Sequence, residues 1–179
     1  MKNELVLLLF AFSTLPVVAQ DQAGSPRAAA GCGPDHVQFD VKTDKKQHSE
    51  ARPEAGKALV YVFEEERQDP NSLPIFAATT RIGLDGRWVG ANHGKSYFFF
   101  SIDPGDHNLC ANWQSSLRMF SKLASAASLT AETGKVYYFE TTIEERNRNK
   151  PAVKIEPIDA AEGKLLLASA SLSNSRPKK

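Results

Sequence analysis

Ala58-Leu59-Val60-Tyr61-Val62-Phe63 is a compact apolar run in which aliphatic, β-branched and aromatic side chains follow one another without a polar break. Gly56 precedes the run, and Glu64-Glu65-Glu66 ends it. A short apolar run of this composition, bounded by turn-forming or charged residues, is typical of a β-strand. The sequence therefore predicts a strand over residues 58–63.

The next part of the chain has the pattern of a β-hairpin. From Phe76 to Leu84 every second residue falls on one largely apolar face, which is the period of a half-buried strand. Asp85-Gly86 follows, and both residue types tolerate the positive φ angles of a tight two-residue turn. Arg87-Trp88-Val89 is the expected partner strand.

Four more strands are expected downstream. Tyr97–Ile102 is apolar on both faces, which is typical of a central strand or one that faces a second layer. Asp103-Pro104-Gly105-Asp106 has the proline and glycine that a type II turn favours, and the strand His107–Trp113 follows it. Val136–Ile143 begins after a glycine, and Ala152–Ile158 comes last.

The segment Ser115–Ala131 carries two competing patterns. Leu117, Phe120 and Leu123 have helical spacing, whereas its last residues alternate as in a strand. We expect a loop or short turn here, followed by a strand that runs into Gly134.

The C-terminal part predicts one helix. Asp159 followed by Glu162 indicates a capped helix start, so a short helix is expected over residues 159–173. Residues 174–179 end in Arg-Pro-Lys-Lys and are expected to form a disordered basic tail. About seven short strands followed by one helix predict an all-β protein, an antiparallel β-sandwich over residues 32–158.

Residues 1–19 are expected to form a cleaved signal peptide. Lys2 gives a weakly positive start, Leu5–Leu15 is almost wholly apolar, and Val17-Val18-Ala19 suits signal peptidase. The run is shorter than the ~20 residues of a membrane span, so we expect no transmembrane segment after cleavage; a buried N-terminal helix is the alternative. Residues 20–31 are expected to form a flexible linker. The mature protein is thus predicted to be exported, to the periplasm or the extracellular space.

Cys32 and Cys110 are the two cysteines of the chain, and both remain after cleavage. In an oxidising compartment such a pair is most simply a disulfide, with two buried thiols as the alternative. The chain has no Cys-x-x-Cys motif, which argues against redox catalysis.

Charge and composition restrict the possible partners. The 179 residues carry a formal net charge of +1 at neutral pH, and 41% of them are hydrophobic. This is ordinary globular composition without a broad basic field, so we expect no nucleic-acid partner.

The sequence contains no assembled catalytic or metal-binding motif. Gly90–Ser96 (GANHGKS) has three residues between its glycines where a phosphate-binding loop has four. His36, His48, His93 and His107 form no His-x-x-x-His pair, and there is no Gly-x-Ser-x-Gly elbow. We therefore predict no cofactor, no metal site and no catalytic residues, and we do not expect an enzyme.

Surface aromatic residues give the candidate binding site. Trp88 lies just beyond the expected hairpin tip, near Asn92, His93 and Tyr97 in the sequence. Flat aromatic faces offer contact area at low entropic cost, so this group is predicted to contact a sugar or a partner side chain. The alternative is that Trp88 fills the core.

Several short motifs occur in the order found in a known family: Cys32-Gly33-Pro34, Phe39–Thr43, Gly56–Val62, Gly83–Gly86, Tyr97–Phe100, Asp103–His107 and Gly134–Phe139. The pattern resembles a family of exported bacterial proteins defined only as a domain of unknown function. It is also similar to small prealbumin-like sandwiches, including carboxypeptidase regulatory-like domains. The resemblance implies a β-sandwich in the cell envelope and carries no catalytic residues.

Three hypotheses about function follow. The first is a non-catalytic exported module that binds an envelope component or another protein. The second is an enzyme of unrecognised type, with His93 or His107 acting beside a carboxylate of Glu64–Glu66. The third is a structural module that docks through its basic tail or its terminal helix.

Overall fold

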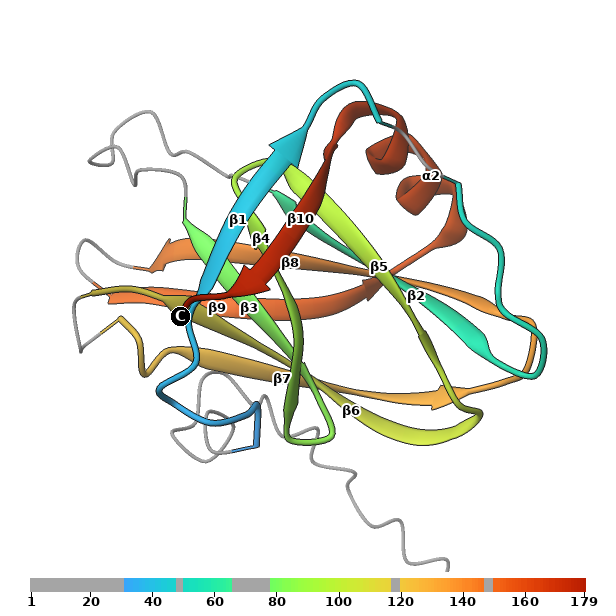
Figure 1. Cartoon of the computed structure of the whole chain (residues 1–179), viewed down its shortest axis with the longest axis horizontal. Coiled ribbons are helices and arrows are strands. Elements are labelled where there is room, and N and C mark those ends of the chain that lie inside the picture. The colour runs from blue at the N-terminus through green and yellow to red at the C-terminus, as the bar shows by residue number, and fades with distance from the viewer. Residues whose placement is uncertain (1–30, 48–49, 66–77, 117–119, 147–149) are drawn as a thin grey trace, which may run out of the picture.

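The computed structural model describes residues 31–47, 50–65, 78–116, 120–146 and 150–179. Across these residues, strands form two sheets that pack as a β-sandwich, and one helix lies near the C-terminus (Figure 1). The elements are β1 (Phe39–Asp44), β2 (Ala58–Glu65), β3 (Thr79–Leu84), β4 (Arg87–His93), β5 (Ser96–Ile102), β6 (Gly105–Gln114), β7 (Ala124–Ala131), β8 (Val136–Arg146), β9 (Lys150–Ile158), α2 (Ala160–Ser169) and β10 (Ser171–Pro177).

The six-stranded sheet, in the order β1-β10-β5-β2-β8-β9, has the apolar run Ala58–Phe63 near its centre. Val60 and Val62 on β2 face the four-stranded sheet, whereas Tyr61 and Phe63 face the helix side, and all four are buried. Burial on both faces explains why this run has no polar break. The pairing of β2 with β8, like that of β10 with β5, is parallel, so the sheet is mixed rather than antiparallel throughout.

The four-stranded sheet has the order β4-β3-β6-β7 and supplies the other wall of the core. Ile82 and Leu109 pack from this sheet against Phe98 and Phe139 of the larger one. Each fully buried side chain of this kind stabilises the fold by about 1.5–3 kcal/mol. The two packed sheets confirm the predicted β-sandwich.

The predicted hairpin turn is confirmed. Asp85 and Gly86 both have positive φ, 50° and 80°, as a tight turn between twisted strands requires. The β3–β4 ladder then shifts register between Ile82 and Gly83, which leaves Val89 as an extra residue between the paired positions Trp88 and Gly90. A β-bulge of this kind changes which face the following residues occupy.

The ambiguous segment after Ser115 contains strand β7, in agreement with the expected strand before Gly134. The C-terminal region differs from its prediction in part. Asp159 caps α2, as expected, by accepting bonds from the backbone N–H groups of Ala161 and Glu162, both at 2.8 Å. However, the helix ends at Ser169, and β10 covers residues 171–177 where a helix end and a disordered tail were expected.

Strands β1 and β10 are the two elements that the sequence did not predict. They pair antiparallel from Phe39–Pro177 to Asp44–Leu172 and run side by side in Figure 1. This β1–β10 ribbon pairs a strand from the start of the described chain with one from its end, and it extends the larger sheet. Among the described residues, no helix has the length and apolar content needed to cross a membrane.

Candidate functional site

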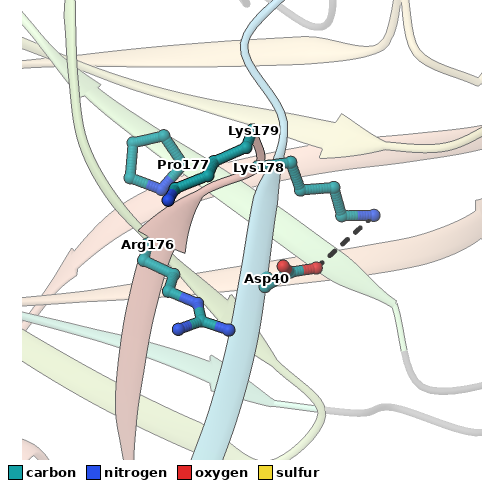
Figure 2. Close-up of a pocket in the computed structure, with 5 residues that line it drawn as sticks. All are labelled: Asp40, Arg176, Pro177, Lys178 and Lys179. Atoms are coloured by element: carbon teal, nitrogen blue, oxygen red, sulfur yellow. Dashed lines mark ion pairs between the residues drawn. The ribbon is translucent and has the colours of Figure 1, made fainter.

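A hollow of about 470 Å³ lies where the β1–β10 ribbon ends. Five residues line it: Asp40, Arg176, Pro177, Lys178 and Lys179 (Figure 2). We call it the basic hollow, because three of these side chains are cationic and one is anionic. Pairing between the two strands creates it, since neither strand alone brings Asp40 next to the C-terminal residues.

One of the three cations is already paired. The ammonium of Lys178 lies 3.8 Å from Oδ1 of Asp40, and both side chains are about half exposed, at 45% and 52%. The backbone N–H of Lys178 also donates to the carbonyl of Gln38 at 2.7 Å, so strand pairing continues past β10 and fixes the position of this residue. An ion pair this exposed is weak and exchanges its partners readily.

The other two cations lie elsewhere around the hollow. Figure 2 shows Lys179 extending over Pro177, away from the Lys178–Asp40 pair. Within the described parts of the chain, neither the Arg176 guanidinium nor the Lys179 ammonium lies within ion-pair distance of a carboxylate. The hollow therefore offers two uncompensated positive charges, which favour an anionic group.

The four residues of the predicted aromatic site are placed apart. Tyr97 on β5 is fully buried on the helix side of the larger sheet, where its ring centroid lies 5.7 Å from that of Phe63 and 6.2 Å from that of Tyr61. It packs in the cluster that Leu167 of α2 also joins. The Tyr97 side chain is therefore part of this inner cluster rather than of an exposed surface.

Asn92 and His93 lie at the end of β4. Asn92 is fully buried and donates from Nδ2 to the carbonyl of Val62 at 2.9 Å, so it links the two sheets from inside. Nδ1 of His93 lies 3.0 Å from the hydroxyl of Thr79, and its backbone N–H donates to Oγ of Ser96 at 3.1 Å. Both residues have roles in holding β4 in place.

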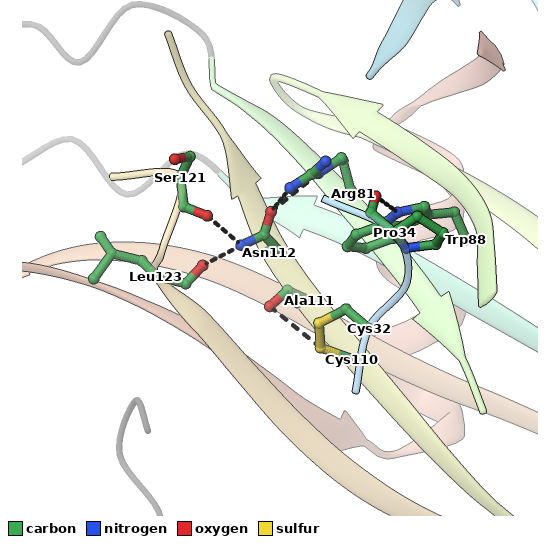
Figure 3. Close-up of a disulfide and its surroundings, with 9 residues drawn as sticks. All are labelled: Cys32, Pro34, Arg81, Trp88, Cys110, Ala111, Asn112, Ser121 and Leu123. Carbon is green, nitrogen blue, oxygen red and sulfur yellow. Dashed lines mark hydrogen bonds between the residues drawn. A yellow bond between two sulfur atoms is a disulfide. The ribbon is translucent and has the colours of Figure 1, made fainter. Parts of the chain in front are cut away.

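Trp88 lies on the opposite, outer face of β4, because the bulge at Val89 separates it from Asn92. There it packs against the segment Gly31–Gln38, which we call the strap, and its Nε1 donates to the carbonyl of Pro34 at 2.9 Å (Figure 3). The Cα of Gly33 is so close to the indole that an added Cβ would lie 2.7 Å from Nε1. Trp88 is thus a half-buried clamp on the strap.

Two further contacts hold the strap on the four-stranded sheet. The predicted disulfide between Cys32 and Cys110 is present, and both cysteines are buried. Arg81 stacks its guanidinium 4.4 Å from the centre of the Trp88 ring and donates from Nε to Asn112 at 3.0 Å. It also donates to strap carbonyls, and its burial lowers the pKa of the guanidinium.

Trp88, Asn92, His93 and Tyr97 therefore do not share one surface.

For the enzyme hypothesis, neither His93 nor His107 forms a hydrogen bond or ion pair with Glu64 or Glu65 among the described residues. Nδ1 of His107 lies 2.7 Å from Oδ2 of Asp85, and its Nε2 lies 2.8 Å from the carbonyl of Asp103. Both neighbours are hydrogen-bond acceptors, so both contacts favour the protonated ring, which has an N–H to donate from each nitrogen. The bond to Asp85 accordingly raises the pKa of His107, while the N–H of Asn108 and then His107 lower the pKa of Asp85.

The two described carboxylates of that hypothesis have other partners. Glu64 points into the sandwich and accepts from the hydroxyl of Thr80 at 2.9 Å. Glu65 lies 3.5 Å from the ammonium of Lys95, and Glu66 is outside the described residues. Nor do the described residues include three or more His, Cys, Asp or Glu side chains grouped to hold a metal ion.

The sequence did not identify the basic hollow, although the Arg-Pro-Lys-Lys ending that contributes most of it is plain in the sequence. The missing information is the pairing of β10 with β1, which places Asp40 opposite Arg176.

Comparison with known proteins identifies the family. No curated protein and no solved structure matches the chain, so the likeness to prealbumin-like domains stays a prediction. A family model matches residues 54–154, a range that begins after the strap and β1 and ends before α2 and β10. Because this range covers more than half of the chain, the protein belongs to the family described as a protein of unknown function, DUF2846.

Proposed function

We propose that the protein is an exported, non-catalytic binding module, and that it holds an anionic component of the cell envelope in the basic hollow. The observation that supports this proposal is the pair of uncompensated cations, Arg176 and Lys179, on the wall of a hollow of about 470 Å³. Ligand sites in proteins commonly have volumes of about 300–1,000 Å³. Two uncompensated positive charges there attract an anion.

Export is supported by two features. Residues 1–19 have the charge, apolar run and small residues of a signal peptide. The Cys32–Cys110 disulfide is consistent with an oxidising compartment. An exported protein meets anionic lipids, glycans and small anions, which are the components that a basic site would select.

The role without catalysis is supported by the way in which the candidate acid–base groups are used. His107 has both ring nitrogens engaged by acceptors, and His93 has Nδ1 engaged by Thr79. Glu64 is bound to Thr80 in the interior. A general acid or base needs a titratable atom within reach of the substrate, and these groups instead hold the strands together.

The proposal is tested with the mature, disulfide-bonded protein, residues 20–179, and two double variants. Arg176→Gln/Lys179→Gln removes the uncompensated cations, whereas Arg87→Gln/Lys164→Gln removes the same charge at exposed positions on β4 and α2. Binding of inorganic phosphate, of succinate and of phosphatidic acid vesicles is measured by calorimetry or sedimentation.

We expect at least one of these anions to bind the wild-type protein and the β4/α2 control alike. Loss of at least about tenfold in affinity is expected for the hollow variant, since each charge-assisted hydrogen bond contributes on that scale. Equal weakening in both double variants would reduce the effect to net charge and contradict the proposal, as would the failure of every anion to bind.

A further inference from the structure

The residues that line the basic hollow indicate which kind of anion it binds. This inference rests on the proposed function. We propose that the hollow binds a phosphate group in its doubly charged state, as carried by a phosphate monoester or by inorganic phosphate. Arg176 and Lys179 bind the phosphate oxygens, and Lys178 remains with Asp40.

The charge of the phosphate group is the first reason. Among the lining side chains, Arg176 and Lys179 are the cations without a carboxylate partner in the described parts of the chain. A phosphate monoester carries about −1.5 to −2 at neutral pH, so one group attracts both cations. A single carboxylate carries about half of that charge and attracts them less.

The kinds of donor are the second reason. A guanidinium presents N–H groups in a planar fork that fits two oxygens of one phosphate, and an ammonium supplies a compact charge to a third. Arg176 provides the fork, and Lys179 provides the ammonium from the Pro177 side of the hollow (Figure 2). A tetrahedral group with three free oxygens uses both donors at once, whereas a planar carboxylate has two oxygens.

The position of these donors on paired backbone is the third reason. Arg176 lies within β10, directly opposite Asp40, and the bond from Lys178 N–H to Gln38 extends the pairing beyond it. The backbone is therefore held against β1 at Arg176 and at Lys178, the residue before Lys179. Less conformational entropy is lost on binding when the donors start from a fixed backbone.

The test titrates isotope-labelled mature protein with inorganic phosphate and, separately, with succinate, which also carries two charges but on carboxylates. The backbone amides of Asp40, Arg176 and Lys178 report on the hollow by NMR. We expect phosphate to shift these amides and to bind at least about threefold more tightly than succinate, because it engages the fork and the ammonium together. Arg176→Lys keeps the charge and loses the fork, so it should remove this preference while retaining weak binding of both anions.

Three other outcomes would overturn the phosphate assignment. If succinate binds as tightly as phosphate, the phosphate assignment is overturned, while the binding of anions in the hollow stands. If neither anion shifts these amides, the phosphate assignment fails, and if phosphatidic acid vesicles do not bind either, the proposed function fails with it. Preference for phosphate that persists in Arg176→Lys would also overturn the assignment, since the fork would then play no part.

The source of the phosphate group is found with phosphatidylcholine vesicles made with and without phosphatidic acid. Sedimentation with phosphatidic acid vesicles that Arg176→Gln/Lys179→Gln abolishes would support the assignment with a lipid headgroup as the source. Binding of inorganic phosphate without vesicle binding would support it with a soluble phosphate compound. Vesicle binding that the double variant retains, in a protein that binds no inorganic phosphate, would count against the hollow.

Discussion

Asp40 and Arg176 are directly opposed in the β1–β10 ladder, yet the cation that approaches the Asp40 carboxylate is Lys178, at 3.8 Å. Arg176 is thus left without an acidic partner among the described residues. The choice of partner matters, because it leaves the planar guanidinium of Arg176 available to an anion, while the Lys178 ammonium lies beside Asp40.

Replacing Asp40 is expected to strengthen the binding of phosphate rather than to weaken it. Asp40→Asn removes the one negative side chain of the hollow and releases Lys178, so phosphate should bind about two- to fivefold more tightly. The free energy of unfolding should change by less than about 0.5 kcal/mol, because the ion pair is half exposed. Calorimetric titration and denaturant unfolding measure the two quantities.

Asp44→Asn is the matched control for that change. It removes the same charge from the same strand, at the end away from the hollow, and keeps an oxygen that can accept from the N–H of Lys46. Affinity for phosphate should be unchanged. A gain equal to that of Asp40→Asn would mean that overall charge, and not the hollow, determines the binding.

Trp88 should contribute to stability and not to binding at the hollow. Trp88→Ala removes the clamp on the strap and should lower the free energy of unfolding by about 2–4 kcal/mol. Trp88→Phe keeps much of the packing and loses the bond to Pro34, so a loss of about 1 kcal/mol is expected. Denaturant unfolding gives both values, and a Trp88→Ala protein of full stability would contradict the assignment of Trp88 as a clamp.

The disulfide should contribute the largest single stabilisation of the strap. Cys32 and Cys110 are 78 residues apart in sequence, and closing such a loop stabilises a fold by about 4–5 kcal/mol in the chain-entropy model. Cys32→Ser/Cys110→Ser should lower the free energy of unfolding accordingly. A thiol assay on the denatured wild-type protein should detect no free thiol; two free thiols would contradict the pairing.

The His107–Asp85 pair predicts how stability depends on pH. The pKa of His107 is raised above 6.5, so its stabilisation is fully present below that pH and is lost as the pH rises through the folded-state pKa. The pKa of Asp85 is lowered below 3.8, so its stabilisation is present above that pH and is lost as the pH falls through the lower folded-state pKa.

His107→Ala should therefore differ most from the wild type between these two limits and least in alkaline solution. Unfolding of both proteins across this pH range provides the comparison, and an NMR titration of the imidazole gives the pKa directly. A His107 pKa at or below 6.5 would contradict the double engagement of its ring by Asp85 and Asp103.

The elements that could be predicted from the sequence are those whose information is local. The run Ala58–Phe63 predicts β2 because a strand buried on both faces has no polar positions, and Asp85-Gly86 predicts its turn because the required φ angles belong to those residues. The disulfide follows from there being two cysteines in a chain that is predicted to be exported.

The elements that could not be predicted depend on contacts between distant segments. Strand β1 buries Phe39 but exposes most of its other side chains, so its alternation carries little signal, and β10 becomes a strand through pairing with it. The predicted aromatic site fails to assemble for a related reason. One bulged residue, Val89, places Trp88 and Asn92 on opposite faces of the strand, and the local sequence pattern does not predict this bulge.

Mapping the position at which an anion binds tests directly whether the basic hollow is the binding site. Inorganic phosphate is added to the isotope-labelled mature protein, and the backbone amide signals are followed across the whole chain by NMR. Binding at the basic hollow predicts that the saturable shifts centre on Asp40, Arg176 and Lys178. Saturable shifts centred elsewhere, with these three amides unmoved, would contradict it.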